Sequence, residues 1–313
     1  MSKNQIISVS APGKIHLLGE HTVVYGKPAL LAAVGLRITV TICHPRGGLR
    51  FAPQDNINKL KKIIEPIVNK KLDLKTIPPY EISIISDIPV GAGLGSSAAV
   101  SVAYITALLI FLKVKWDLNL INNLAYEAEK IFHGNPSGGD NTTVVYGGLI
   151  SYTKGKPIQP LSLSITPKLA KNFVLINTGK PQETTKEMVE IVRVKREAER
   201  VKFQKIFDNQ EKLVKELLFV IKTANEKDFI RIIREGEKNL ERIGVVSHYV
   251  KSIIKQIEKS GGAGKICGGG GKTKGTGILL CYHPKKTVIE KIAKSLNLPY
   301  FSVALGVEGL KRH

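Results

Sequence analysis

The sequence contains few cysteines and few aromatic residues, and it has no long apolar run. Its 313 residues include three cysteines, and Phe, Trp and Tyr together make up 6%. The three cysteines form no Cys-x-x-Cys pair, and their odd number argues against a disulfide framework. No apolar run could cross a bilayer without interruption, and the N-terminus lacks the apolar region of a secretory signal peptide. These absences predict a cytoplasmic protein that is not inserted in a membrane.

Acidic residues are also scarce, with 26 Asp and Glu against 47 Lys and Arg, so the net charge is +21. Such an excess can indicate nucleic acid binding. However, the basic residues of segment 186–259 are interleaved with acidic ones, as on the exposed faces of amphipathic helices. No basic strip carries aromatic residues on which bases could stack. We therefore expect no nucleic acid partner, and keep a basic RNA-associated protein only as a remote alternative.

Length and pattern predict two domains of mixed architecture. A chain of this length can bury a large core. Strand-like and helix-like segments are mixed without regular alternation, which predicts an α+β fold. We place the domains at 1–168 and 169–313. The expected elements include a turn at Pro12-Gly13, a helix over 58–71 interrupted at Pro66, and a helical region over about 183–259 broken near Asn225 and Gly244.

A glycine-rich loop precedes the most apolar helix of the chain. Residues 89–99 have the sequence PVGAGLGSSAA, and an apolar helix is predicted from Ser96 onward. Three glycines allow a tight backbone whose N–H groups converge on one point, and Ser96 and Ser97 are suited to cap the helix. Together with the helix dipole this predicts a phosphate site made of backbone. The spacing differs from the dinucleotide pattern Gly-x-Gly-x-x-Gly, because position 96 is serine.

Several charged residues near turns are candidates for chemistry, and each also has a structural interpretation. Asp140 follows a glycine and proline turn and could act on a substrate or cap a helix. Glu129 borders the apolar stripe of a helix over 117–132, where it could bind a metal or be a satisfied buried acid. Lys14 could stabilise a transition state or form a structural ion pair, and His21 alone is more often structural. The 268–275 loop is not a Walker A motif, and alone it suits a hairpin as well as a ligand loop.

Four motifs occur together and in order: APGKIHLLGEHTVVYG, PVGAGLGSSAA, EKIFHGNPSGGDN and KICGGGGKTKG. With them the chain resembles the GHMP kinase superfamily over nearly its whole length and, within it, the mevalonate kinases, most of all archaeal-like members. The resemblance implies a GHMP kinase fold, with an N-terminal domain like ribosomal protein S5 and a C-terminal ferredoxin-like domain. It implies ATP-dependent phosphorylation of (R)-mevalonate at the C5 hydroxyl, and it leaves room for a homodimer.

The resemblance also implies roles for the matching residues. Asp140 would act as the base on the C5 hydroxyl, paired with Lys14. Glu20, His21 and Thr184 would help to hold mevalonate. Mg²⁺ is the expected cofactor, with Ser97 and Glu129 as its ligands. ATP would be bound by Pro89, Gly91, Ala92, Gly93, Leu94, Gly95, Ser96, Ser97, Gly268, Gly269, Gly270 and Gly271.

The chain departs from the family pattern at two places. Four glycines are followed by Lys272, Thr273 and Lys274, and Gln182 stands where many mevalonate kinases have arginine, so that Lys180 could substitute. Other GHMP enzymes are the nearest alternatives. Phosphomevalonate kinase stays open because of the added lysines, whereas Val23 stands where galactokinases have a sugar-binding aspartate. The motifs of Glu129 and Asp140 disfavour a diphosphomevalonate decarboxylase.

Overall fold

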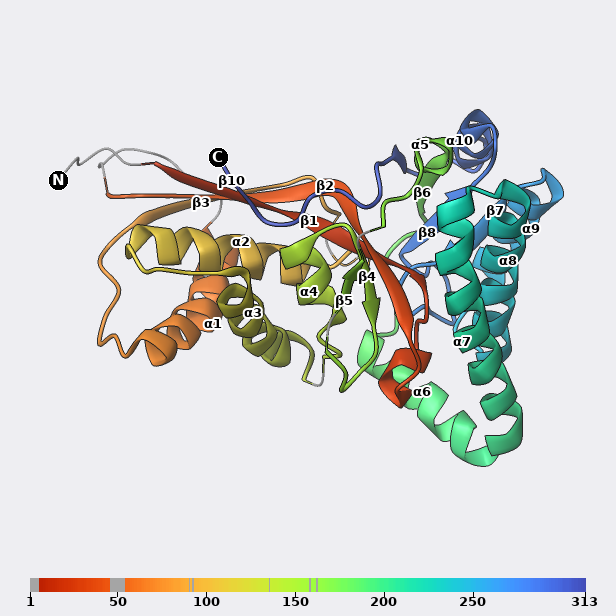
Figure 1. The fold of residues 1–313 in the computed structure, drawn as a ribbon, viewed down its shortest axis with the longest axis horizontal. Helices are drawn as coiled ribbons and strands as arrows, with labels where there is room; N and C mark the ends of the chain where they lie inside the picture. The colour runs from red at the N-terminus through yellow and green to blue at the C-terminus, as the bar shows by residue number, and fades with distance from the viewer. Residues whose placement is uncertain are drawn as a thin grey trace.

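The protein is described here from a computed structural model, which covers residues 6–45, 54–89, 91, 93–134, 136–157, 159–161 and 163–313. Two antiparallel sheets lie toward opposite ends of an elongated molecule, and each is covered by helices (Figure 1). The prediction of an α+β fold is therefore confirmed.

The first sheet is built around two long N-terminal strands. Its strand order is β10-β1-β2-β4-β5, and β3 also pairs with β2. β1 is continuous through Pro12 and Gly13, so the predicted turn there is wrong. A register shift between these two residues accommodates the proline, which has no N–H to donate. The strands are β1 (Ile7–Leu18), β2 (Ala29–Cys43), β3 (Glu81–Ser86), β4 (Leu149–Tyr152), β5 (Gln159–Leu161) and β10 (Lys311–Arg312).

Four helices lie on one side of this sheet, as Figure 1 shows. They are α1 (Gln54–Leu72), α2 (Ser96–Phe111), α3 (Leu118–His133) and α4 (Gly139–Tyr146). α2 packs on β1 and β2 and is buried on nearly all sides, as its apolar sequence predicts. Pro66 lies inside α1, so the predicted interruption is wrong.

The serines do not cap α2. Its N-cap is Gly95 in the left-handed conformation, and within the described residues no side chain caps it. Ser96 and Ser97 are instead the first two helical residues. The first N–H groups of α2 are thus left without a side-chain acceptor, which suits an external anion better than the predicted serine cap does.

The second sheet has the strand order β7-β8-β6-β9. Helices α8 and α9 pack on β7, and α10 on β6. The predicted breaks near Asn225 and Gly244 are confirmed, and a further break at Glu199 was not predicted. The elements are β6 (Phe173–Asn177), β7 (Ala263–Ile266), β8 (Ile278–Tyr282), β9 (Tyr300–Ser302), α5 (Pro167–Ala170), α6 (Thr185–Ala198), α7 (Arg200–Thr223), α8 (Glu226–Ile243), α9 (His248–Lys259) and α10 (Lys286–Ser295).

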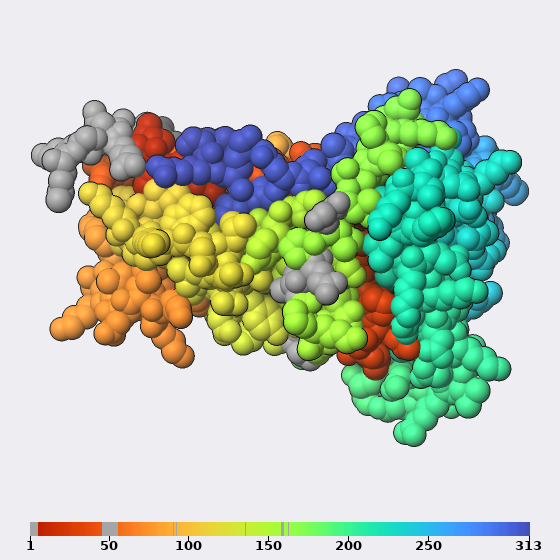
Figure 2. All heavy atoms as spheres, viewed as in Figure 1, coloured from red at the N-terminus to blue at the C-terminus, as the bar shows by residue number. Residues whose placement is uncertain are grey.

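Segments from both halves of the chain meet at the C-terminal end of β1. α7 and α8 contact β1, and the short 3-10 helix η1 (Thr22–Tyr25) follows there. Figure 2 shows this N-terminal surface, in red, between the yellow-green part of the chain and the blue-green helices. The last strand, β10, returns to pair with β1. Among the described residues no helix combines the length and apolar character that a membrane crossing needs.

Candidate active site

Lys14 and Asp140 form an ion pair where β1 meets α4. Lys14 Nζ lies 2.9 Å from Asp140 Oδ2, and the side chains are 5% and 32% exposed. Asp140 is the second residue of α4, whose N-cap is Gly138, so the interpretation of Asp140 as the cap is wrong. Burial acts to raise the pKa of Asp140, but Lys14 and His16 outweigh it and the pKa is lowered. Asp140 is therefore a carboxylate at neutral pH.

The glycine loop and Lys14 form one unit. The Lys14 N–H donates to the Leu94 carbonyl oxygen at 2.9 Å. Gly95 has φ of +71°, and a Cβ there would lie 2.7 Å from Lys14 Cγ. Glycine is thus required at 95 both for the turn and for the passage of the lysine. Lys14 is thereby fixed beside the N-terminus of α2. Ala92, which was also predicted to bind ATP, lies outside the described residues.

Ser97, Glu129 and His133 form a polar group at the first turn of α2. Ser97 Oγ lies 3.0 Å from His133 Nε2, and Glu129 Oε2 lies 3.6 Å from the same nitrogen. Glu129 is buried, and its Oε1 has no hydrogen-bond partner among the residues described. Burial and then Asp140 raise the pKa of Glu129 to about 7. An orphaned carboxylate oxygen near a hydroxyl fits a hard cation that completes its shell with phosphate oxygens and water.

The second glycine loop, between β7 and β8, lies against the first. A Cβ on Gly93 would be 3.9 Å from Gly268 Cα. The loop is also tied to the N-terminal segment, because His21 Nε2 lies 3.0 Å from the Gly269 carbonyl oxygen. Burial lowers the pKa of His21 to about 4, so its ring is neutral at pH 7. The loop therefore connects β7 and β8 and at the same time faces the predicted phosphate site.

Two predicted substrate residues have partners within the protein. Glu20 is buried and forms an ion pair with the buried Lys265. Thr184 caps α6, since its Oγ1 accepts from the Glu187 N–H at 3.2 Å and Glu187 bonds back to the Thr184 N–H. Their contacts with substrate stay predictions.

Sequence comparisons point to a known family. Residues 58–148 match the model for the N-terminal domain of GHMP kinases, and residues 2–44 match the galactokinase galactose-binding signature. The chain is 32% identical to the mevalonate kinase of Archaeoglobus fulgidus over 268 residues, or 84% of this chain and 88% of the relative. The chain belongs to the mevalonate kinase family.

A second relative agrees with this membership, and a solved structure shows the fold. The mevalonate kinase of Thermococcus gammatolerans is 32% identical over 299 residues, covering 85% of this chain and 86% of the relative. The structure of L. major mevalonate kinase in complex with R-mevalonate superposes with a TM-score of 0.79 at 20% identity, with 96% of each chain covered. The predicted GHMP kinase fold is thus confirmed.

The departures from the mevalonate kinase pattern lie beside the glycine loops. A Cβ on Gly91 would be 3.6 Å from Lys180 Cε, so the Lys180 side chain runs along the first loop. Thr273 Oγ1 donates to Glu183 Oε1 at 2.7 Å, which ties the added 272–274 segment to the start of α6. Lys180 therefore brings a positive charge to the loop from the segment that contains Gln182.

Three residues near the site were missed by sequence reasoning. His133 lies four residues after Glu129 and so shares its helix face, but the predicted helix ended one residue earlier, at 132. Lys265 could have been suspected as a lone lysine in an apolar strand. Lys27 carried no sequence signal, since its partners are 181 and 184 residues away in the chain.

Proposed function

We propose roles for the residues of this site in the reaction of the mevalonate kinase family, ATP-dependent phosphorylation of (R)-mevalonate at the C5 hydroxyl. The chain catalyses this reaction, which gives 5-phosphomevalonate for isoprenoid synthesis. The observation that carries the roles is the Lys14–Asp140 pair beside a glycine loop at the N-terminus of α2. Phosphoryl transfer needs such a positioned carboxylate and a cation next to a phosphate site.

Asp140 orients the attacking hydroxyl and receives its proton. One carboxylate oxygen pairs with Lys14, so the other is available to accept the hydrogen bond of the C5 hydroxyl. Because the pKa of Asp140 is lowered, it is a weak base and takes the proton late, as the bond from the C5 oxygen to the γ-phosphorus forms and the bond to the β-phosphate oxygen breaks. Lys14 stabilises the negative charge that develops on the transferred group.

The loops bind the nucleotide and a divalent metal. The N–H groups at the N-terminus of α2 would bind the phosphates together with those of the first loop, and Gly268 of the second loop lies against Gly93. A kinase that uses ATP needs a divalent metal, and Ser97 and Glu129 would hold Mg²⁺ here. When bound, the ion neutralises phosphate charge.

Glu129→Gln raises the Mg²⁺ concentration needed for half-maximal activity by about tenfold, because an amide is a poorer ligand than a carboxylate. Since Glu129 has a pKa raised to about 7, protons compete with the metal, and the Mg²⁺ requirement of the wild type increases as the pH falls below 7. Mg²⁺ titrations of ADP release at pH 6 and pH 8 measure both effects. Glu127→Gln, an exposed change on the same helix, is the control. Equal Mg²⁺ curves for the two variants would contradict the assignment.

A substrate comparison tests the function itself. A coupled ADP-release assay with mevalonate, phosphomevalonate, galactose and homoserine is expected to show turnover with mevalonate alone. Phosphomevalonate kinase is the second candidate, since Lys272 and Lys274 are exposed in the second glycine loop and could hold an added phosphate. Turnover that is faster with phosphomevalonate than with mevalonate would decide for this alternative.

A further inference from the structure

The turn that carries Glu20 and His21 has a strained backbone. We call residues 19–27 the signature turn. His21 has φ of +59° and ψ of −39°, a region that a residue with a Cβ rarely adopts. Thr22 Oγ1 donates to the Gly19 carbonyl oxygen at 3.2 Å, and the Lys27 N–H donates to the Thr22 carbonyl oxygen at 3.3 Å. Strain of this kind persists only where surrounding contacts hold it.

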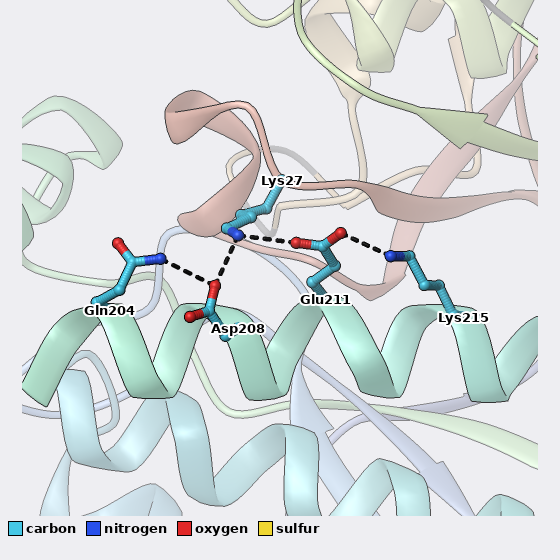
Figure 3. Close-up of polar contacts among 5 residues, drawn as sticks. All are labelled: Lys27, Gln204, Asp208, Glu211 and Lys215. Atoms are coloured by element: carbon cyan, nitrogen blue, oxygen red, sulfur yellow. Dashed lines mark hydrogen bonds and ion pairs between the residues drawn. The ribbon is translucent and has the colours of Figure 1, made fainter.

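Those contacts come from the C-terminal half of the chain, and they hold both ends of the signature turn. At its start, His21 contacts the Gly269 carbonyl oxygen. At its end, Lys27 Nζ bonds to Asp208 Oδ1 at 2.7 Å and to Glu211 Oε2 at 2.8 Å (Figure 3). Asp208 and Glu211 are neighbours on one face of α7, so a single ammonium group bridges both. The turn is therefore held between the second glycine loop and α7.

The two acidic partners are themselves held in place. Gln204 Nε2 donates to Asp208 Oδ1 at 2.9 Å, and Lys215 Nζ donates to Glu211 Oε1 at 2.7 Å (Figure 3). Lys27 and Glu211 are 22% and 27% exposed, so both are partly shielded from water, whereas Asp208 is 54% exposed. The carboxylates of Asp208 and Glu211 thus form a preorganised acceptor site for one lysine. We call these two carboxylates the socket.

An apolar contact supports the socket from the same side. The Tyr25 ring lies 5.1 Å from that of Phe207 on α7, and the guanidinium of Arg196 lies over Tyr25 at 4.7 Å. The aromatic contact packs the turn against α7. The ion pairs of Lys27 add directional contacts, because two hydrogen bonds to fixed acceptors define an orientation.

We propose that Lys27 is a positioning residue. Its ion pairs with Asp208 and Glu211 hold the signature turn, and with it Glu20 and His21, at the mevalonate end of the site. Lys27 itself does not touch the reacting atoms. This inference rests on the proposed function. The socket lies on α7 and not on a glycine loop, so it couples the placement of α7 to the binding of mevalonate, while the contact of His21 with the second glycine loop is retained.

The test compares Lys27→Met with Lys212→Met. Lys212 is a matched control, because its ion pair lies within α7, with Glu216 at 3.8 Å. For Lys27→Met we expect the KM for mevalonate to rise about threefold to fivefold, the range for the loss of partly exposed ion pairs. The kcat should stay within about twofold and the KM for ATP should not change, since transition-state contacts are retained. Lys27→Arg, which can also reach two carboxylates, should restore the KM.

The double variant Asp208→Asn with Glu211→Gln removes the two carboxylates on α7 that accept from Lys27. It provides the test if Lys27→Met fails to fold. It should raise the KM for mevalonate to the same level, and adding Lys27→Met should raise it no further. A KM for mevalonate in Lys27→Met equal to that of Lys212→Met overturns the inference. So does a parallel change of kcat and both KM values with a lower melting temperature, which indicates general damage. A wild type that does not phosphorylate mevalonate overturns the proposed function instead.

Discussion

Asp140→Asn lowers kcat by about a hundredfold or more, while the KM for ATP stays within about twofold. The amide has nearly the shape of the carboxylate, so the hydroxyl can still bind. It carries no charge to pair with Lys14 at 2.9 Å and cannot accept the proton of the hydroxyl. Both contributions are made mainly in the transition state. The loss therefore falls on kcat and not on nucleotide binding.

Single-turnover and steady-state rates of ADP release measure this effect. Asp73→Asn is the matched control, because Asp73 is exposed and its backbone has φ of +52°, which asparagine adopts as readily. The control should keep wild-type kcat. If Asp140→Asn turned over like the wild type with an intact Mg²⁺ requirement, Asp140 would be a structural partner of Lys14 only.

Local chemistry made much of this site predictable. Three closely spaced glycines before an apolar helix predict a phosphate loop without knowledge of the rest of the fold. The glycine and proline turn before Asp140 indicates a helix start, and the Asp140 carboxylate lies there in the structure. The incorrect predictions were local interpretations that tertiary contacts overrode. Gly95 replaced the serines as the cap of α2, where Lys14 crosses the loop, and α1 continues through Pro66.

Contacts between distant segments could not be predicted in the same way. Lys265 reaches Glu20 across 245 residues, and Lys27 reaches α7 across 181. Periodicity and capping rules describe neighbours within one element, and they do not pair a lysine of the second sheet with a glutamate in the turn after β1. The signature turn is therefore recognisable from its sequence, whereas its supports become visible only in the folded chain.

Lys265→Met lowers the free energy of unfolding by about 3–5 kcal/mol, the usual cost of removing one partner of a buried ion pair. Lys265 is fully buried. Its ammonium bonds to Glu20, to the His16 carbonyl oxygen at 3.1 Å and to the Ile266 carbonyl oxygen at 2.5 Å. Burial acts to lower the pKa of Lys265, but Glu20 outweighs it and the pKa is raised, so the ammonium is charged. Methionine fills similar space but leaves a buried carboxylate without its counter-ion.

The loss of unfolding free energy in Lys265→Met depends on pH, and the titration of Glu20 determines the direction of this dependence. Burial raises the pKa of Glu20, and the loss of Lys265 removes the main opposing effect. The folded variant therefore holds a proton that the unfolded chain releases above its ordinary pKa of about 4.5. The stability that this proton contributes to the variant is retained below that pH. It is lost as the pH rises through the pKa of Glu20 in the folded state. Denaturant unfolding should accordingly show a smaller deficit at pH 5 than at pH 8.

Two variants separate charge from packing in this cluster. Glu20→Gln with Lys265→Met removes both charges of the pair, so it should recover part of the lost stability. Its deficit should depend on pH less than that of Lys265→Met, because the buried Glu237, which Lys265 also faces, still titrates. Lys255→Met, an exposed change on α9, should stay within about 0.5 kcal/mol of the wild type. If Lys265→Met and the double variant were equally unstable at both pH values, the loss would come from packing around β7. The Glu20–Lys265 pair would then orient the signature turn without stabilising the fold.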